Sequence, residues 1–226
     1  MKLSENTLSV LKNFSTINQN LLIKPGKTLS TMSAMKNIVA TAKVEEDFKQ
    51  QIAFYDLNEF LASLSLFSEA DLKFEENFVI ISEDNKTLKL DKTLKYWYSD
   101  ASIVTTPTKI ITMPSVEVTF TLSKDILSDV TKAAAVIGAP DMVLEDGKLS
   151  VTNKKNDTSN DYSIKLDVSS EENKKYKFWF KAENLKFLSG TYDVEISSKK
   201  ITHFVNKNLP IEYFVALESE STYNNG

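Results

Sequence analysis

The sequence repeats itself weakly, with matching segments 117 to 122 residues apart. The matches are Leu3–Ser9 with Leu122–Ser128, Asp71–Phe74 with Asp193–Ile196, and Leu94–Tyr98 with Ile211–Val215. Because all three keep the same order along the chain, each half encodes one structural unit of about 110 residues. Such a repeat is typical of two similar domains.

Each half has the pattern of one long helix, several strands, a shorter helix and further strands. Ser4 and Ser123 are N-caps of the long helices, and the apolar residues that follow each of them share one helical face. We place Asn13 on the polar side of the first helix. The shorter helices are predicted at Leu57–Phe67 and at Ala182–Leu188, which Gly190 would end. The predicted fold class is therefore α+β, with antiparallel sheets and two helices in each domain.

Alternating or continuous apolar runs predict the strands. In the first half they are Leu21–Ile23, Thr28–Met32, Asn37–Lys43, Gln50–Tyr55, Leu72–Phe74, Phe78–Ser82, Thr87–Leu90 and Leu94–Tyr98. In the second half they are Val116–Leu122, Met142–Leu144, Leu149–Val151, Tyr162–Val168, Tyr176–Phe180, Thr191–Ser197, Ile201–Val205 and Ile211–Leu217. Turns are expected at Glu83–Asn85 and, most strongly, at Asp146-Gly147.

Ser99–Pro114 holds two of the five prolines, no glycine and no helical period, and we interpret it as an extended connector. The expected division is an N-terminal domain at 1–100, a connector at 101–114 and a C-terminal domain at 115–226.

The composition gives catalysis little support. The chain has no cysteine, five glycines and one histidine, His203, which lies in an alternating strand where a structural role is the commoner one. Paired carboxylates such as Glu75-Glu76 fall in predicted turns and are most simply solubilising charge. We therefore expect no catalytic residue, cofactor or metal site.

The net charge is −4, and all 27 basic residues are lysines. Arginine makes the commonest bidentate contact to guanine, so its absence argues against sequence-specific DNA recognition, although basic and acidic surfaces can still be segregated. No apolar run approaches the roughly 20 residues of a membrane span. The N-terminus also lacks the apolar core of a signal peptide, so a cytoplasmic protein is expected.

Three segments resemble the DNA polymerase sliding clamps, specifically those of the T-even bacteriophages. They are MKLSENTLSVLKNFSTIN at the N-terminus, Phe54–Leu61 at the second helix and Ile211–Glu220 near the end. The resemblance implies two tandem clamp domains, a closed ring of three subunits and no catalysis. It also implies that the ring tethers the replicative polymerase to duplex DNA in the host cytoplasm, after an ATP-dependent clamp loader has opened it.

Helix packing gives an independent consistency test. With four helices per subunit, a trimer has twelve around its hole, and packed helices lie about 8–10 Å apart. After about 10 Å is removed for helix bodies and side chains, the hole is about 25 Å wide. Eight helices from a dimer would leave only about 13 Å by the same arithmetic, too narrow for a duplex about 20 Å wide.

The helix faces opposite the apolar stripes carry the candidate DNA-facing lysines, Lys12, Lys124 and Lys132, with Lys186 on the fourth helix as a poorer candidate. The sharper hypothesis is loose, sequence-independent contact with phosphates. The alternative is an ordinary solvated polar face. The second helix offers Glu59 and no lysine, so the positive field is expected to be weak.

Two further sites follow from the resemblance. Clamp subunits pair an edge strand of one domain with an edge strand of the neighbour. The expected interface residues are Leu94, Tyr96, Trp97, Tyr98, Tyr162, Ile164 and Leu166. For the aromatic residues Tyr96, Trp97 and Tyr98, packing in the core is the alternative. A C-terminal peptide of the polymerase would dock at Ile103, Ile110, Ile111 and Phe214, although the connector's apolar side chains could instead only cover a seam between domains.

A processivity clamp is therefore the first functional hypothesis. A non-catalytic, β-rich phage structural or scaffold protein is the alternative, because meanders and linkers also suit such roles.

Overall fold

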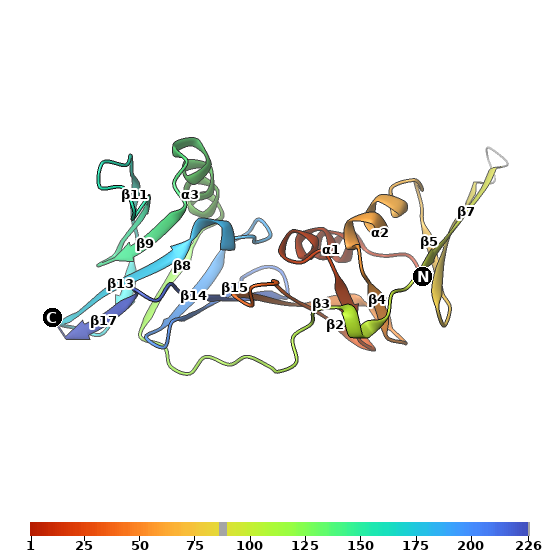
Figure 1. Ribbon diagram of the computed structural model, residues 1–226, viewed down its shortest axis with the longest axis horizontal. Helices are drawn as coiled ribbons and strands as arrows, with labels where there is room; N and C mark the ends of the chain where they lie inside the picture. The colour runs from red at the N-terminus through yellow and green to blue at the C-terminus, as the bar shows by residue number, and fades with distance from the viewer. Residues whose placement is uncertain (86–89, 226) are drawn as a thin grey trace. The chain divides into compact units, whose positions relative to one another are not determined.

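The computed structural model describes residues 1–85 and 90–225, and the chain divides into two units (Figure 1). The first unit comprises Met1–Lys36 and Ala40–Thr108, and the second comprises Asn37–Val39 and Lys109–Gly226. Three α-helices and antiparallel strand pairs make up the described residues, which gives the predicted α+β class.

Helix α1 (Glu5–Ile17) begins after Ser4, as predicted. The Ser4 hydroxyl accepts a hydrogen bond from the Thr7 N–H at 3.2 Å, which satisfies one of the free donors of the first turn. The prediction that Asn13 faces solvent is wrong, because its side chain is buried. Helix α1 packs against both α2 and β2, so more of its circumference is covered than one apolar stripe indicates.

The first unit contains most of the strands predicted for the first half of the chain. Its further elements are β1 (Leu21–Ile23), β2 (Gly26–Met32), β3 (Ile38–Phe48, which begins in the second unit), β4 (Ile52–Phe54), α2 (Leu57–Leu64), β5 (Asp71–Phe74), β6 (Phe78–Asn85), β7 (Leu90–Trp97) and the 3-10 turn η1 (Ala101–Ile103). Helix α2 ends before the predicted Phe67. The N–H groups of Leu66 and Phe67 bond to carbonyls three residues back, so the helix tightens into turns.

Strands β5, β6 and β7 form an antiparallel meander in that order. The turn predicted at Glu83–Asn85 is wrong, because β6 continues to Asn85. Glu83 is buried and its carboxylate accepts a hydrogen bond from the Ser68 N–H at 2.9 Å, which fixes this part of the strand. The strand predicted at Thr87–Leu90 lies outside the described residues except for Leu90.

The second unit opens with β8 (Val118–Leu122) and α3 (Lys124–Ile137), whose N-cap is Ser123 as predicted. The turn at Asp146-Gly147 is confirmed, with φ values of 46° and 80°, the left-handed pair that a type I′ hairpin requires. The remaining elements are β9 (Asp141–Glu145), β10 (Lys148–Thr152), β11 (Tyr162–Lys165), β12 (Val168–Ser170), β13 (Lys174–Lys181), the 3-10 turn η2 (Ala182–Asn184), β14 (Tyr192–Ser197), β15 (Ile201–Asn206), β16 (Ile211–Ala216) and β17 (Thr222–Asn225).

Two sheets result in this unit. One has the order β11-β10-β9-β13-β17, and helix α3 packs on its β10 and β11. The other has the order β12-β8-β14-β15-β16, beside which the first residues of β3 lie. The single strand predicted at Tyr162–Val168 is wrong, because β11 and β12 belong to different sheets. Strand β17, which pairs with β13, was not predicted.

The helix predicted at Ala182–Leu188 is also wrong, so the second unit has one α-helix where two were expected. Only η2 forms there. The Phe187 ring lies 4.5 Å from the Tyr213 ring and 4.6 Å from the Phe204 ring, and the Leu188 N–H donates to the Tyr213 hydroxyl at 3.0 Å. This packing holds the backbone in an irregular path, because so short a helix has little stability of its own.

Glu46 on β3 anchors the start of α1. It is 9% exposed, and its carboxylate accepts hydrogen bonds from the Ser4 N–H and the Thr7 hydroxyl. Burial by itself would raise the pKa of Glu46, but these hydrogen bonds outweigh burial and hold the pKa below its ordinary value. A depressed folded-state pKa gives stability that is present at neutral pH and lost as pH falls through that pKa.

We predict that Glu46→Gln lowers the free energy of unfolding at pH 7 by about 1–3 kcal/mol, because buried donors then lose a charged acceptor. The difference from the wild type should shrink as pH falls through the depressed pKa of Glu46, where the carboxyl group of the wild type protonates. Urea denaturation at a fixed protein concentration measures both effects. Glu45→Gln is the matched control, since Glu45 is exposed. Equal losses in the two variants would contradict this role for Glu46.

Candidate nucleic-acid and partner interfaces

Lys12 lies on the exposed side of α1. Glu5, Ser9 and Thr16 are exposed at helical spacing from it and form one stripe with it. Among the described residues, no carboxylate lies within 4 Å of the Lys12 ammonium group. Its charge is therefore available to an external anion, and the small neighbours leave the stripe open.

Helix α3 exposes Lys124 and Lys132, and neither forms an ion pair with a described residue. In the internal repeat, with its offset of 119 residues, Lys12 corresponds to Thr131, and Asn13 corresponds to Lys132. The two long helices therefore carry their lysines at different points of their surfaces. A loose, sequence-independent contact with phosphates tolerates such a difference, whereas a fixed register with bases would not.

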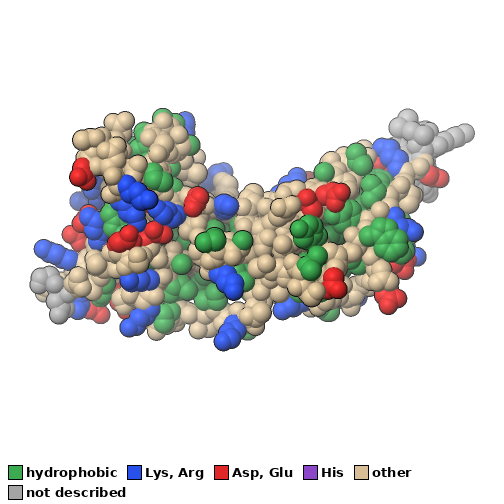
Figure 2. Space-filling view, viewed as in Figure 1, with side chains coloured by type: hydrophobic (Ala, Val, Ile, Leu, Met, Phe, Trp, Pro, Cys, Tyr) green, Lys and Arg blue, Asp and Glu red, His purple; other side chains and the backbone are tan. Residues whose placement is uncertain are grey.

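Lys186 does not lie on a helix, because the segment after η2 is irregular. Its side chain is exposed. Acidic residues interrupt the lysines elsewhere, with Glu59 on α2 and Asp125 and Asp129 on α3. Figure 2 shows lysines and acidic residues interspersed on the visible face. Acidic residues therefore offset part of the lysine charge on these helices.

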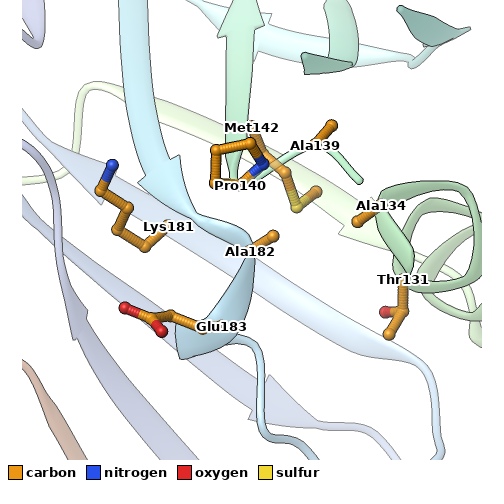
Figure 3. A pocket seen from close by; sticks show the side chains of 8 residues that line it. All are labelled: Thr131, Ala134, Ala139, Pro140, Met142, Lys181, Ala182 and Glu183. Carbon is orange, nitrogen blue, oxygen red and sulfur yellow. The ribbon is translucent and has the colours of Figure 1, made fainter. Parts of the chain in front are cut away.

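A pocket of about 430 Å³ lies in the second unit between α3, the Ala139–Met142 segment and the end of β13 (Figure 3). Lys181 lines it, but its ammonium group is 2.6 Å from the carboxylate of Asp141, which is 1% exposed. The hydrogen bond to Asp141 raises the pKa of Lys181. Because this charge is already neutralised and Glu183 also lines the pocket, the pocket does not suit a phosphate group.

Both strands predicted at the subunit interface are edge strands. Strand β7 has only β6 as a neighbour among the described residues, and β11 has only β10. Each therefore presents backbone N–H and C=O groups that no described strand satisfies. Ile164 lies in β11 and is half-buried, while Leu166 follows the strand, is buried, and its N–H donates to the Gly147 carbonyl at 2.8 Å.

The side chains of β7 alternate as predicted. Tyr96 and Tyr98 contact Phe54 at ring distances of 5.9 and 6.2 Å, so they belong to the core side of the strand, together with the half-buried Leu94. Trp97 points the other way, packs edge-on to Phe78 at 5.1 Å and is 62% exposed. In β11, Tyr162 is 36% exposed. In β7, the face with Tyr96 and Tyr98 therefore packs on the core, and the opposite face, with Trp97, is exposed.

The connector residues differ in burial. Ile110 is 93% exposed, Ile103 is 56% exposed and Ile111 is half-buried. Phe214 on β16 is 8% exposed, and its ring stacks on the His203 imidazole at 4.1 Å with a 3° angle between the planes. Phe214 therefore already has one aromatic neighbour, which the sequence did not indicate.

Comparison with known proteins decides the family. The family model of the DNA polymerase processivity factors matches residues 2–113. The sliding clamp of Vibrio phage KVP40 is 32% identical over 227 residues, which cover 97% of this chain and 100% of the relative. The chain belongs to the sliding-clamp family of DNA polymerase processivity factors.

Other clamps agree over nearly the full length. The sliding clamps of Escherichia phage RB69 and Enterobacteria phage T4 are 27% and 28% identical, and each alignment covers 99% of both chains. Among solved structures, a PCNA2–PCNA3 complex from Sulfolobus tokodaii matches with a TM-score of 0.67 at 12% identity, covering 94% of this chain and 96% of that one. Proliferating cellular nuclear antigen from Entamoeba histolytica gives 0.65 at 11% identity, covering 94% and 95%. These two likenesses show the fold alone.

Membership of this family confirms the clamp hypothesis and decides against a structural or scaffold protein. Sliding clamps are not catalysts. Within the described residues, no cluster of His, Cys, Asp or Glu is suited to a metal ion, and no helix is long and apolar enough to cross a membrane.

Sequence reasoning missed one polar cluster of this clamp. Glu195, His203 and Glu212 come together on adjacent strands, with both imidazole nitrogens facing carboxylates. The alternation of β14, β15 and β16 places each residue on the outer face, but strand register was needed to bring them into contact. The only available signal was the uncommon histidine itself.

We predict opposite effects for the two tyrosines of β7. The Tyr98 hydroxyl is buried without a hydrogen-bond partner among the described residues, whereas the Tyr96 hydroxyl lies 3.1 Å from both the Asp56 carbonyl and the Glu59 carboxylate and can donate to either. Tyr98→Phe should therefore leave the free energy of unfolding unchanged or raise it by up to about 1 kcal/mol, and Tyr96→Phe should lower it by about 0.5–1.5 kcal/mol. Urea denaturation at one protein concentration compares them.

The same pair can be compared at alkaline pH. Burial raises the pKa of Tyr98 to about 12, with a smaller contribution from the Glu75 carboxylate. Because the folded-state pKa lies above the unfolded value near 10, the associated stability is full below pH 10 and is lost as pH rises toward 12. Tyr98→Phe should lose less stability than the wild type in that window. A larger loss in Tyr98→Phe, at either pH, would contradict this account of the hydroxyl.

Proposed function

We propose that this clamp acts as a closed ring of three identical subunits that encircles duplex DNA without reading its sequence. The observation that carries the proposal is the pair of free strand edges, β7 in the first unit and β11 in the second. If β7 of one subunit pairs with β11 of the next, each contact uses two different surfaces. Contacts of this head-to-tail kind generate a ring when the rotation closes.

Family membership supports an oligomer that acts with a polymerase. With three α-helices rather than four in the described part of each chain, helix packing alone no longer fixes the number of subunits. The trimer is proposed instead from the resemblance to the clamps, which implies two tandem domains per chain and three subunits per ring. Residues 1–100 and 115–226 would be those domains, with residues 101–114 connecting them.

The exposed helix faces would then line the hole. Lys12, Lys124 and Lys132 are solvent-exposed and have no acidic partner among the described residues, so they are suited to transient contacts with phosphates. Lys186 would add charge from the irregular segment after η2. The weak field favours sliding, because strong and regular contacts would hold the ring at one position.

The polymerase would be held by a C-terminal peptide at the connector, and an ATP-dependent loader would use the same surface to place the ring on DNA. Ile103 and Ile110 are exposed apolar residues, at 56% and 93%, and this exposure supports a role in binding a partner. Ile111 and Phe214 would form the more buried part of the pocket.

We predict a homotrimer of about 76 kDa, three times the 25.5 kDa chain. Light scattering coupled to size-exclusion chromatography, over a concentration series and at moderate salt, measures this mass. Rings dissociate on dilution, so the series separates a weak trimer from a stable monomer. A monomer or dimer mass at every micromolar concentration would overturn the proposal.

We predict that Lys12→Ala combined with Lys132→Ala lowers processivity and reduces the salt dependence of DNA binding. Each lost phosphate contact should reduce the slope of log affinity against log salt by about 1. Fold and trimer mass should stay unchanged. Lys27→Ala with Lys199→Ala is the matched control, because both residues are exposed and lie outside the helices. If the control loses as much, or if the first variant dissociates, the helix lysines are not DNA contacts.

We predict that Ile111→Asp and Phe214→Ala each weaken binding of the C-terminal peptide of the polymerase from the same phage by at least about tenfold, since apolar anchors dominate such contacts. Fluorescence anisotropy of the labelled peptide measures the affinity. Ring mass serves as the control for both variants. Undiminished affinity in both, with intact rings, would place the pocket elsewhere.

A further inference from the structure

The free edge of β7 presents the backbone groups of residues whose side chains face solvent. The Tyr98 N–H donates to the Asn77 carbonyl at 3.0 Å, so the backbone groups of Tyr98 are directed toward β6. Because this direction alternates along a strand, the N–H and C=O groups of Asp91, Lys95 and Trp97 are directed away from β6. The side chains of these three residues are exposed.

The free edge of β11 is built in the same way. The Leu166 N–H donates to the Gly147 carbonyl at 2.8 Å, so the alternation directs the backbone groups of Lys165 and Ser163 away from β10. By the same alternation, the groups of Asp161, which directly precedes β11, are directed to that side. Asp161 and Lys165 are exposed, and the Ser163 hydroxyl donates to the Asp161 carboxylate at 3.1 Å. Both edges therefore offer the hydrogen-bonding groups of residues on their solvent-facing sides.

This match restricts how the two edges can pair. Residues directly opposite each other in an antiparallel pair place their side chains on the same face. If the free groups of β7 bond to those of β11, the solvent-facing sides join, and the core-facing sides, with Tyr96 and Tyr162, join as well. Tyr162 belongs to the core-facing side because it lies opposite Val151, which is 0% exposed. A shift by one residue would turn one strand over, so the remaining registers differ in steps of two residues.

The charges on the two edges are arranged in matching order. Asp91 and Lys95 are four residues apart on β7, and Asp161 and Lys165 are four residues apart at β11. An antiparallel pair that places Lys95 opposite Asp161 therefore also brings the other two charges, which are opposite in sign, face to face. A parallel pair would instead align like charges. Among the described residues, none of the four lies within 4 Å of an oppositely charged group.

Each edge strand also carries a like-charge pair inside its own sheet. In the register of β6 and β7, Asp91 lies opposite Asp84. In the register of β10 and β11, Lys165 lies opposite Lys148. Like charges directly opposite each other destabilise a sheet. A contact between Asp91 and Lys165 of neighbouring subunits would therefore offset both repulsions.

We propose that β7 of one subunit pairs antiparallel with β11 of the next in the register that places Lys95 opposite Asp161. Asp91 then lies opposite Lys165. This inference rests on the proposed ring of identical subunits and names the contacts that select its register. Ion pairs between exposed groups are individually weak, so they contribute little to the total affinity. Their effect is specificity, because other registers lose both pairs or bring like charges together.

The neighbouring registers are less favourable. A shift of two residues places Lys95 opposite Ser163 or Ser159 and removes both ion pairs. A shift of four residues places Lys95 opposite Lys165, which is repulsive. The Lys95 ammonium group lies 4.5 Å from the centre of the Phe78 ring in its own subunit. A ring contact does not neutralise the positive charge, which therefore remains available to the next subunit.

The chain contains no cysteine, so engineered cysteine pairs can report the register of the full-length clamp directly. Leu94→Cys with Tyr162→Cys places two residues opposite each other, with Cα atoms about 4.5 Å apart. Leu94→Cys with Ile164→Cys is the matched pair for the register shifted by two residues. In the proposed register its Cα atoms are roughly 7–8 Å apart, which is too far for an unstrained disulfide. Under mild oxidation, the first pair should give at least about fivefold more disulfide-linked subunits on a denaturing gel than the second.

Charge reversal tests the ion pair itself. Lys95→Glu should raise the protein concentration at which half of the trimer dissociates by about tenfold, because two carboxylates then face each other at all three interfaces of the ring. Adding Asp161→Lys should bring this concentration back to within about threefold of the wild type. Lys95→Glu with Glu172→Lys is the matched control, because Glu172 is exposed and the net charge is the same, and it should stay as weak as Lys95→Glu alone. Light scattering over a concentration series measures all four proteins.

Two kinds of failure can be distinguished. If the wild type is a monomer at every concentration, the ring proposal falls and the register falls with it. If the wild type is a trimer but the Leu94/Ile164 cysteines cross-link as well as the Leu94/Tyr162 cysteines, or neither pair cross-links, the ring stands and the register is wrong. The register is also wrong if Asp161→Lys restores the Lys95→Glu variant no better than the matched control does. Urea denaturation of each variant is the control for folding of the subunit.

Discussion

The proposed assembly depends on the backbone N–H and C=O groups at two strand edges, which no described strand satisfies. Strands β7 and β11 each have one neighbour among the described residues, so the outer N–H and C=O groups of both must bond to water or to another chain. Natural proteins usually protect such edges. Here Trp97 and Tyr162 leave aromatic surface at both edges, which favours strand pairing with a second copy over permanent exposure.

The electrostatics of the chain suit the same role. A protein that must stay on DNA and still move along it gains from contacts that are individually weak and indifferent to sequence. Lysine without arginine provides point charges rather than bidentate contacts, and the acidic residues among the lysines keep the attraction low. Stable attachment would then come from topology, while affinity for phosphates stays low.

The sequence predicted the elements that local chemistry determines. Ser4 and Ser123 cap the long helices, and Asp146-Gly147 makes the predicted hairpin, because each signal acts within a few residues. The prediction failed where distant residues decide the backbone. Phe187 packs among aromatic rings from β14, β15 and β16, and this prevents the helix expected at Ala182–Leu188. The contact between His203 and its two glutamates could likewise not be predicted from the sequence, because it depends on the register of three strands. The assignment to the clamps came from residue-by-residue resemblance, which composition alone could not supply.

Topological linkage to DNA is the central claim, and retention on circular against linear DNA tests it most directly. The ATP-dependent loader would place the clamp on a nicked circular plasmid, and the complex would be separated from free protein in high salt. The amount of clamp retained on the DNA would then be measured before and after the plasmid is cut once. A closed ring predicts stable retention on the circle and rapid loss after cutting, with retention restored when the ends are blocked by bound protein. Equal retention on circular and linear DNA, or equal loss from both, would contradict the ring.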